Sequence, residues 1–311
     1  MTQPINDLMD LIKLCESYDS EKTYDLDMKR LSQITKPLIC LNNMIGMNSI
    51  KQDIVDHILY YIQNIDSEID MMHTVIYGPP GTGKTEVAKL IANIYLGLGV
   101  LKKDVFIKAT RSTLIGQYLG QTAPLTQKVI NSAIGGVLFI DEVYSLGNSE
   151  KRDSYSKECI DTINENLTDK KTDFICIIAG YKEDVKKCFF SYNKGLERRF
   201  PITFQIDNYN GEELFQIFCK KIKDSNWLVG SEIEKEFFIT NYKDFPNFGG
   251  DMEILFNRCK KSYTRRTFCS GVNNKMISRE DLDNGFKIYK MHRDETNTPN
   301  KDDEMWKNMY L

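Results

Sequence analysis

The stretch His73-Thr-Val-Ile-Tyr-Gly-Pro-Pro-Gly-Thr-Gly-Lys-Thr85 decides the fold of this chain of 311 residues. It opens with a short β-branched run typical of a buried strand, and strong helix formers follow from Lys84 to Ala92. Between them, Gly78 to Thr85 match the pattern G-x-x-x-x-G-K-[ST] in the strand–loop–helix setting that this pattern requires. Glycines let backbone N–H groups turn towards a phosphate, and the positive end of the helix dipole faces the same anion. The stretch therefore predicts a phosphate-binding loop.

Within this loop, a cation and a hydroxyl are expected to play different parts. Lys84 places a full positive charge at the β- and γ-phosphates of a nucleotide, and the Thr85 hydroxyl can bind Mg²⁺. The residues predicted to contact the nucleotide here are Gly78, Pro79, Pro80, Gly81, Thr82, Gly83, Lys84, Thr85 and Glu86.

A second motif, Gly136-Val-Leu-Phe-Ile-Asp-Glu142, follows further along the chain. Its apolar residues predict a buried strand that delivers two carboxylates at its C-terminal edge, where open α/β sheets bind ligands. We expect Asp141 to hold the Mg²⁺ shell and Glu142 to orient and polarise the attacking water. The two motifs together predict nucleotide hydrolysis.

Apolar runs alternate with helix-compatible segments as far as Ile206, after which the periodicity is helical. Such alternation predicts a parallel sheet with helices on both faces. The expected strands are His73–Tyr77, Val105–Lys108, Gly136–Ile140, Phe174–Ala179 and Ile202–Ile206. We expect a helical N-terminal segment at 1–40, an αβα nucleotide-binding domain at 41–206, an all-helical domain at 207–292 and a polar tail at 293–311.

Composition argues against several classes of function. The 41 basic and 44 acidic residues leave a formal net charge of −3, which disfavours a generally basic, nucleic-acid-binding surface. No apolar stretch approaches the ~20 residues of a membrane span, and the N-terminus lacks a signal pattern. Eight cysteines without a C-x-x-C pair indicate reduced thiols. We therefore expect a soluble, cytoplasmic protein.

Three longer stretches resemble one family. They are Ala109–Pro124, with the string Gly116-Gln-Tyr-Leu-Gly-Gln-Thr-Ala-Pro124, then Gly135–Tyr144, and then Ile178–Lys182. With the two motifs above, they resemble the CbbX/CfxQ branch of the AAA+ ATPases, which includes red-type Rubisco activase and stage V sporulation protein K. The resemblance covers roughly residues 41 to 263. It implies a P-loop NTPase core of αβα type, a smaller helical lid domain, and a ring, usually a hexamer, that remodels a protein with ATP and Mg²⁺.

The resemblance also implies two sites that act on other chains. Tyr118, Leu119 and Gly120 are similar to the aromatic pore loop that grips a threaded polypeptide. Arg199 is similar to the arginine finger that reaches the ATP of the neighbouring subunit and stabilises charge during hydrolysis. Its neighbour Arg198 is expected to be an accessory or a solvated residue.

Two further segments complete the implied nucleotide site, and two positions depart from the family. Ile45 and Gly46 are similar to the segment that lines the adenine. Tyr181 is the candidate for the sensor-1 position, where many AAA+ proteins have a polar Asn or Thr, and it is expected to take part in catalysis. Gly250 stands where the family usually has a sensor-2 arginine.

Two other functions compete with protein remodelling. The first is an AAA+ machine that acts on nucleic acid, which the acidic balance and the Tyr118 loop disfavour. The second is an ATP-dependent assembly scaffold with low turnover, which the missing sensor-2 arginine keeps open. The expected partners are further copies of this chain, in a homo-oligomeric ring, and a protein substrate of unknown identity. Neither a nucleic acid nor a membrane is expected as a partner.

Overall fold

The computed structural model describes residues 4–63, 71–148, 150, 153–269 and 274–297. It divides into two compact units, one of Met1–Pro79 with Gly83–Asn208 and one of Pro80–Thr82 with Tyr209–Leu311. Within the described ranges, no helix combines the length and the hydropathy that crossing a bilayer requires.

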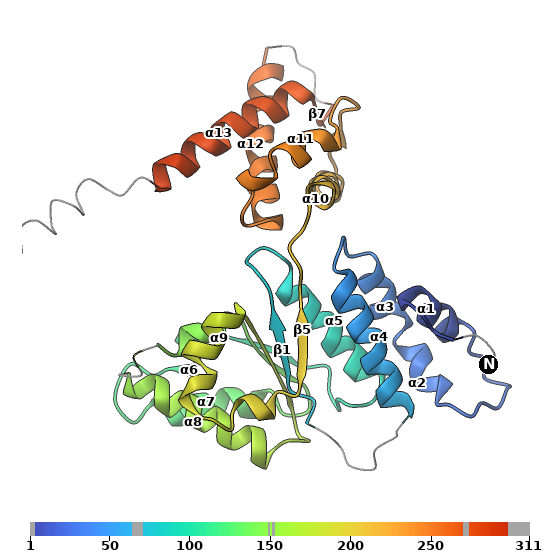
Figure 1. Cartoon of the computed structure of the whole chain (residues 1–311), viewed down its shortest axis with the longest axis vertical. Coiled ribbons are helices and arrows are strands. Elements are labelled where there is room, and N and C mark those ends of the chain that lie inside the picture. Colours follow the sequence, from blue (N-terminus) through green and yellow to red (C-terminus); the bar gives the residue numbers. More distant parts are fainter. Residues whose placement is uncertain (1–3, 64–70, 149, 151–152, 270–273, 298–311) are drawn as a thin grey trace, which may run out of the picture. The chain divides into compact units, whose positions relative to one another are not determined.

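The first unit is built on a five-stranded parallel sheet with the strand order β2-β3-β4-β1-β5 (Figure 1). The strands are β1 (Thr74–Tyr77), β2 (Phe106–Ala109), β3 (Val137–Ile140), β4 (Ile175–Gly180) and β5 (Ile202–Gln205). All five expected strands are confirmed, each within one residue at either end. Strands β1, β3 and β4 are buried along their whole length, as expected for parallel strands covered on both faces. The strand order places β1 between β4 and β5, which gives the sheet its switch point.

Helices cover both faces of the sheet (Figure 1). On one side lie α6 (Arg111–Leu114), α7 (Thr122–Ser132), α8 (Ser154–Asp169) and α9 (Lys182–Cys188). On the other side lies α5 (Lys84–Gly97). The side chains of Leu138 and Ile178 belong to one buried cluster with Ile160 and Ile163 of α8. The αβα layering that the alternating pattern predicts is therefore confirmed.

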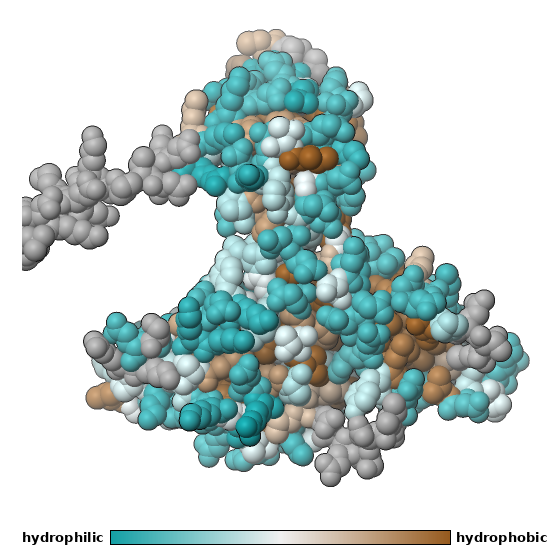
Figure 2. Space-filling view, viewed as in Figure 1, coloured by the Kyte–Doolittle hydropathy of each residue, from teal (hydrophilic) through white to brown (hydrophobic). Residues whose placement is uncertain are grey.

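The N-terminal helices belong to the first unit, and the last of them contacts strand β5 directly. They are α1 (Leu8–Glu16), α2 (Met28–Gln33), α3 (Thr35–Asn42) and α4 (Asn48–Gln63). The chain packs closely on α5 here, because a Cβ built on Gly97 would lie 2.7 Å from Cγ2 of the buried Ile34. Leu38 and Leu41, both fully buried, share one face of α3, so the expected boundary after residue 40 falls inside a helix. Figure 2 shows a mostly hydrophilic face, with hydrophobic residues gathered beside these helices.

The second unit is mostly helical, as expected. Its helices are α10 (Gly211–Asp224), α11 (Lys235–Thr240), α12 (Gly249–Thr267) and α13 (Arg279–Asn297). A pair of two-residue parallel strands, β6 (Leu228–Val229) and β7 (Met276–Ile277), stands beside them, which the all-helical expectation lacked. Helix α13 continues through residues 293–297 of the expected polar tail, and residues 298–311 lie outside the described ranges.

Candidate nucleotide and magnesium site

The phosphate loop joins the end of β1 to the start of α5. Gly83 has a φ of +85°, in the left-handed region that glycine adopts without steric cost, and α5 begins at the next residue. The Nζ atom of Lys84 donates hydrogen bonds to the carbonyl oxygens of Gly78, at 3.1 Å, and Pro79, at 2.8 Å. The loop thus holds the lysine ammonium at the N-terminal end of α5, where the helix dipole attracts anions.

The other predicted loop residues differ in their surroundings. Pro80, Gly81 and Thr82 are grouped with the second unit. Gly81 also has a positive φ, of +70°. The carboxylate of Glu86 forms an ion pair with Lys89, with Oε1 at 3.0 Å from Nζ. Glu86 therefore faces a lysine of its own helix.

The two predicted metal ligands lie together. Thr85 stands in the first turn of α5 and Asp141 directly follows β3, yet the Thr85 hydroxyl donates a hydrogen bond of 3.0 Å to Oδ2 of Asp141. A hydroxyl and a carboxylate are the hard oxygen donors that Mg²⁺ prefers, and Mg²⁺ commonly binds through such groups and nucleotide phosphates. The donor set therefore fits the ion that the two motifs imply.

Glu142 adopts a left-handed backbone conformation, with φ 49° and ψ 47°, which is unfavourable for a residue that has a Cβ. Its N–H group donates to Oδ1 of Asp141 at 3.1 Å, and the 3-10 helix η1 (Val143–Leu146) begins directly after it. Glu142 is exposed, whereas Asp141 is partly buried. The two neighbouring carboxylates therefore lie in different surroundings.

Tyr181, which follows β4, lies beside the lysine of the phosphate loop. Its ring centroid is 5.7 Å from Nζ of Lys84. Burial, together with the carboxylates of Glu142 and Asp184, raises the pKa of the Tyr181 phenol. Burial also lowers the pKa of Lys84, while the charges of Asp141 and Glu142 oppose that shift. Three motifs separated in sequence thus meet at the C-terminal edge of β1, β3 and β4.

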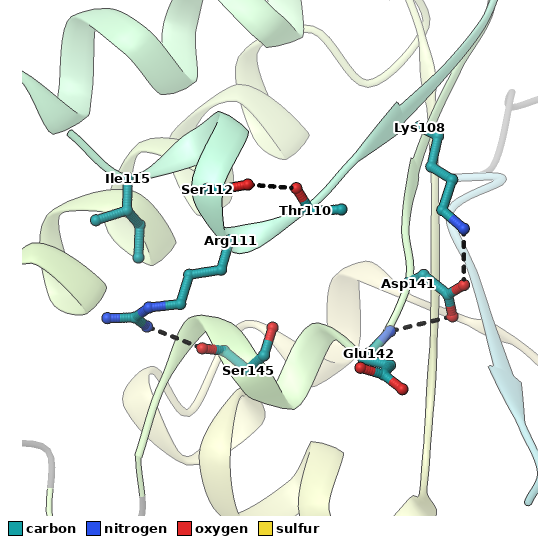
Figure 3. Close-up of a pocket in the computed structure, with 8 residues that line it drawn as sticks. All are labelled: Lys108, Thr110, Arg111, Ser112, Ile115, Asp141, Glu142 and Ser145. Carbon is teal, nitrogen blue, oxygen red and sulfur yellow. Dashed lines mark hydrogen bonds and ion pairs between the residues drawn. The ribbon is translucent and has the colours of Figure 1, made fainter. Parts of the chain in front are cut away.

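Lys108 is a site residue that sequence reasoning missed. Its Nζ atom lies 3.2 Å from Oδ2 of Asp141 (Figure 3). A signal was present in the expected parallel sheet, because Lys108 ends the expected strand Val105–Lys108 and parallel strands end at the same edge; in the structure β2 pairs with β3. Lys108 and both carboxylates line a pocket of about 670 Å³, whose lining residues are Lys108, Thr110, Arg111, Ser112, Ile115, Asp141, Glu142 and Ser145.

Arg111 is a second missed residue, and it fixes the segment after Glu142. Its Nη1 atom donates to the carbonyl oxygens of Ser145, at 2.8 Å, and Leu146, at 3.0 Å, and to Oγ of Ser156 at 3.1 Å. Its Nη2 atom lies 2.6 Å from Oδ2 of Asp153, the N-cap of α8. Burial alone would raise the pKa of Asp153, but hydrogen bonds from Ser156 and Arg111 outweigh it and lower this pKa to about 2. One guanidinium therefore joins α6, η1 and α8.

The expected adenine segment lies next to the phosphate loop. Gly46 has a φ of +64°, and Ile45 is partly buried. A Cβ built on Gly83 would lie 3.4 Å from Cε of Met47 and 3.6 Å from Cε of Met44. The residues that flank Ile45 and Gly46 are thus within contact range of the loop.

The Tyr118 loop, residues 116–121, presents its tip to solvent. Tyr118 is 67% exposed and Leu119 is 79% exposed. Gly120 has a φ of +78°, and a Cβ built on it would meet nothing within 4 Å. The base of the loop is closed by the N–H group of Gly116, which donates to Oγ1 of Thr122 at 3.2 Å. Tyr118 is therefore not a core residue.

The two adjacent arginines before β5 differ in their contacts. Arg199 is partly buried; its Nε donates to Oγ1 of Thr168 at 2.7 Å and its Nη1 donates to the carbonyl of Gly195 at 2.8 Å. Arg198 is exposed. Neither lies among the residues that line the pocket beside Asp141.

Comparisons with known proteins identify the family of this chain. The AAA family, the ATPase family associated with various cellular activities, matches residues 74–208. A putative cfxQ-like protein of Acanthamoeba polyphaga mimivirus is 43% identical over 299 residues, which cover 94% of this chain and 73% of that protein. Stage V sporulation protein K of Bacillus subtilis is 34% identical, over 68% of this chain and 67% of its own length.

Two further relatives extend the comparison. The chloroplastic ribulose bisphosphate carboxylase/oxygenase activase of Cyanidioschyzon merolae is 31% identical, over 85% of this chain and 93% of its own. A solved katanin chain superposes with a TM-score of 0.54 over 79% of this chain and 83% of the katanin chain, and at 18% identity it shares the fold alone. The chain therefore belongs to the CfxQ-like branch of the AAA family and is an AAA+ ATPase.

Proposed function

We propose that copies of this chain form a homo-oligomeric ring, a hexamer in the family pattern, that hydrolyses ATP and pulls a partner polypeptide with the Tyr118 loop. The observation that carries the proposal is the exposure of Tyr118 and Leu119, at 67% and 79%, on a loop that follows Ile115, a residue lining the pocket beside Asp141. An aromatic side chain offers a large gripping surface that tolerates varied sequence. Gly120 lets the tip change shape.

In the proposed site each residue of the chain has one task. Lys84 and the start of α5 bind the phosphates, and Thr85 and Asp141 would hold Mg²⁺. The ion supplies charge neutralisation at the phosphates when it is bound. Glu142 would orient a water and accept its proton, which its exposure and its position next to Asp141 support. Tyr181 would hold the Lys84 ammonium in position.

The ring is proposed because hydrolysis would need a cation from a neighbouring copy. Arg199 remains the proposed finger, and its bonds to Thr168 and Gly195 must then be exchanged for contacts across the subunit boundary. The test mixes Arg199→Ala subunits with Lys84→Ala subunits. Each variant alone should be inactive, and the mixture should recover part of the activity, because some of its interfaces combine an intact loop with an intact finger.

Two outcomes of the mixing experiment would contradict the role of Arg199. Rings that form from the mixture without recovering activity would show that the arginine does not act in trans. An Arg198→Ala variant that loses hydrolysis while Arg199→Ala retains it would move the finger to the exposed neighbour.

The remodelling step is tested on a captured partner. Glu142→Gln should keep the nucleotide bound without turnover, so affinity capture with this variant should retain the substrate protein. Remodelling of that protein is then measured beside ATP hydrolysis for Tyr118→Ala and Tyr118→Phe. We expect Tyr118→Ala to abolish remodelling with basal hydrolysis intact, and Tyr118→Phe to be mild, because the ring face does the gripping.

The competing functions give different results in the same assays. Hydrolysis stimulated by DNA and suppressed by salt would indicate a machine that acts on nucleic acid. Capture without measurable turnover in the wild-type chain would indicate an assembly scaffold. Remodelling that persists in a stable Tyr118→Ala variant would mean that the chain acts on its partner without threading it.

A further inference from the structure

Both oxygens of the Asp141 carboxylate already accept hydrogen bonds. Oδ1 accepts the N–H group of Glu142 at 3.1 Å, and Oδ2 accepts the Thr85 hydroxyl at 3.0 Å. The same Oδ2 atom also lies 3.2 Å from Nζ of Lys108. The Lys108 ammonium carries a full positive charge. It contacts Oδ2, the same oxygen that accepts the hydroxyl of Thr85, the other expected Mg²⁺ ligand.

The sheet register brings Lys108 to this position. Lys108 pairs with Phe139 of β3, two residues before Asp141. Its Nζ atom lies 5.9 Å from the centroid of the Phe139 ring, so the side chain follows the strand edge towards the carboxylate. Figure 3 shows Lys108 reaching from β2 to Asp141, with Glu142 beside it.

A lysine ammonium and a divalent cation cannot share one carboxylate oxygen without strong repulsion. Mg²⁺ can bind Asp141 through Oδ2 only if the Lys108 ammonium moves away. The lysine has room to do so, because its side chain is 48% exposed and lines the pocket of about 670 Å³. Its exposure also keeps the pair weak enough to break.

We propose that Lys108 is a built-in competitor of Mg²⁺ for Asp141 and sets the metal concentration at which the chain binds its nucleotide. The inference rests on the proposed role of Asp141 as a metal ligand. It makes Lys108 a positioning residue that acts through Asp141.

The test measures metal binding directly. Mn²⁺, a paramagnetic substitute for Mg²⁺, is titrated into the full chain with a non-hydrolysable ATP analogue, and bound Mn²⁺ is followed by electron paramagnetic resonance. Lys108→Met keeps the length of the side chain and removes its charge. The Mn²⁺ concentration at half saturation should fall about two- to fivefold, the factor expected for a partly exposed ion pair.

Two control variants separate the effect of the charge of Lys108 from the effect of its position. Lys108→Arg keeps the charge and should bind Mn²⁺ as the wild type does. Lys89→Met removes a charge of the same sign from α5, where Lys89 pairs with Glu86 at 3.0 Å, and it should leave Mn²⁺ binding unchanged. In an Asp141→Asn background, Lys108→Met should have no further effect, because the shared oxygen has lost its charge.

Each other outcome overturns the inference in a distinguishable way. Unchanged Mn²⁺ affinity in Lys108→Met would show that the lysine does not compete. An effect that persists in the Asp141→Asn background would show that Lys108 acts through the general field and not through Asp141. A wild-type chain that binds the ATP analogue but no Mn²⁺ would refute the proposed metal site itself.

Discussion

Strands β2 and β3 lie side by side in the sheet, yet the two connections that leave them are built in opposite ways. After β3, Glu142 turns directly into η1, whose carbonyl groups at Ser145 and Leu146 are bonded by Arg111. After β2, the chain runs through α6 into a loop whose tip, at Tyr118, is 67% exposed. The first connection is fixed by several hydrogen bonds, and the tip of the second is open to solvent.

The contrast separates two requirements of the proposed remodelling activity. A group that must meet a reacting atom needs a position fixed by its surroundings, because small displacements of a catalytic group cost large factors in rate. A group that must grip many different sequences needs exposure and freedom instead. Arg111 links the two connections. It lies in α6, in the connection after β2, and it donates hydrogen bonds to carbonyl groups of η1, in the connection after β3.

The largest expected effect lies in the fixed connection. Glu142→Gln should slow ATP hydrolysis by ~10²–10⁴, the usual contribution of a general base, because the amide cannot accept a proton from water. Nucleotide affinity should change little, since shape is preserved. Turnover assays and calorimetric titration of the same preparation test both parts. Hydrolysis close to that of the wild type would show that a carboxylate other than Glu142 accepts the proton from water.

Lys84→Ala should give the next largest effect. Loss of a charged hydrogen-bond donor should weaken ATP binding ~10- to 100-fold, as measured by calorimetry. Lys89→Ala is the matched control, because it removes the same charge from the same helix at an exposed ion pair with Glu86. Equal losses in the two variants would mean that overall charge, and not the loop, governs nucleotide affinity.

Arg111→Ala tests whether the fixed connection depends on its guanidinium. The free energy of unfolding should fall by about 2 kcal/mol, because the carbonyls of Ser145 and Leu146 and the carboxylate of Asp153 lose a charged partner. Urea unfolding measures the change. A variant as stable as the wild type would remove the basis for calling this connection fixed.

His73 extends the comparison to the other end of the sheet. It is fully buried: Nδ1 accepts the N–H group of Cys176 at 3.1 Å, and Nε2 lies 3.3 Å from the carbonyl of Leu167. Burial, partly opposed by the Leu167 hydrogen bond, lowers the pKa of His73 from 6.5 to about 4.

The sign of the pH dependence follows from that shift. Above pH 6.5 the imidazole is neutral in both states, and the fold loses nothing. Between pH 6.5 and about 4 the unfolded chain takes up a proton that the folded chain resists, so stability falls, by about 2 kcal/mol at pH 5. Urea midpoints at pH 7 and pH 5 measure this, and His73→Gln should remove most of the difference. If the urea midpoints of His73→Gln differ between pH 7 and pH 5 as much as those of the wild type, other titrating groups cause the pH dependence.

The smallest expected effect belongs to the open connection. Tyr118→Ala should change the free energy of unfolding by no more than about 0.5 kcal/mol, as is usual for exposed positions without specific contacts. Thermal unfolding beside that of Arg111→Ala gives the sharpest comparison. A loss at Tyr118 as large as the loss at Arg111 would mean that both connections are fixed.

The sequence predicted those parts of the fold in which the local hydrophobic pattern matches the burial of the segment. The strands were located within one residue, because buried parallel strands are continuous apolar runs bounded by turns. The phosphate loop and the Asp141–Glu142 pair were found because each motif specifies its own chemistry. Tyr181 was placed at the same edge through the family resemblance, and its role in catalysis stays a prediction.

The rest depends on contacts between distant residues. Lys108 and Arg111 are isolated basic residues, and their importance comes from partners more than thirty positions away. The two-residue strands β6 and β7 are too short to show a period. The boundary expected after residue 40 falls inside α3, because the local pattern did not show that Leu38 and Leu41 belong to one buried helical face.

The left-handed turn at Glu142 also bears on how far this chain could be stabilised. A glycine at that position would adopt φ 49° without the steric cost that a Cβ imposes, and the relief amounts to about 1 kcal/mol. Glu142→Gly should therefore melt at a higher temperature than Glu142→Gln, although both are expected to hydrolyse ATP more slowly than the wild type. Selection for thermal stability alone would favour the loss of the carboxylate, so the residue on which turnover is proposed to depend also limits the stability of the fold.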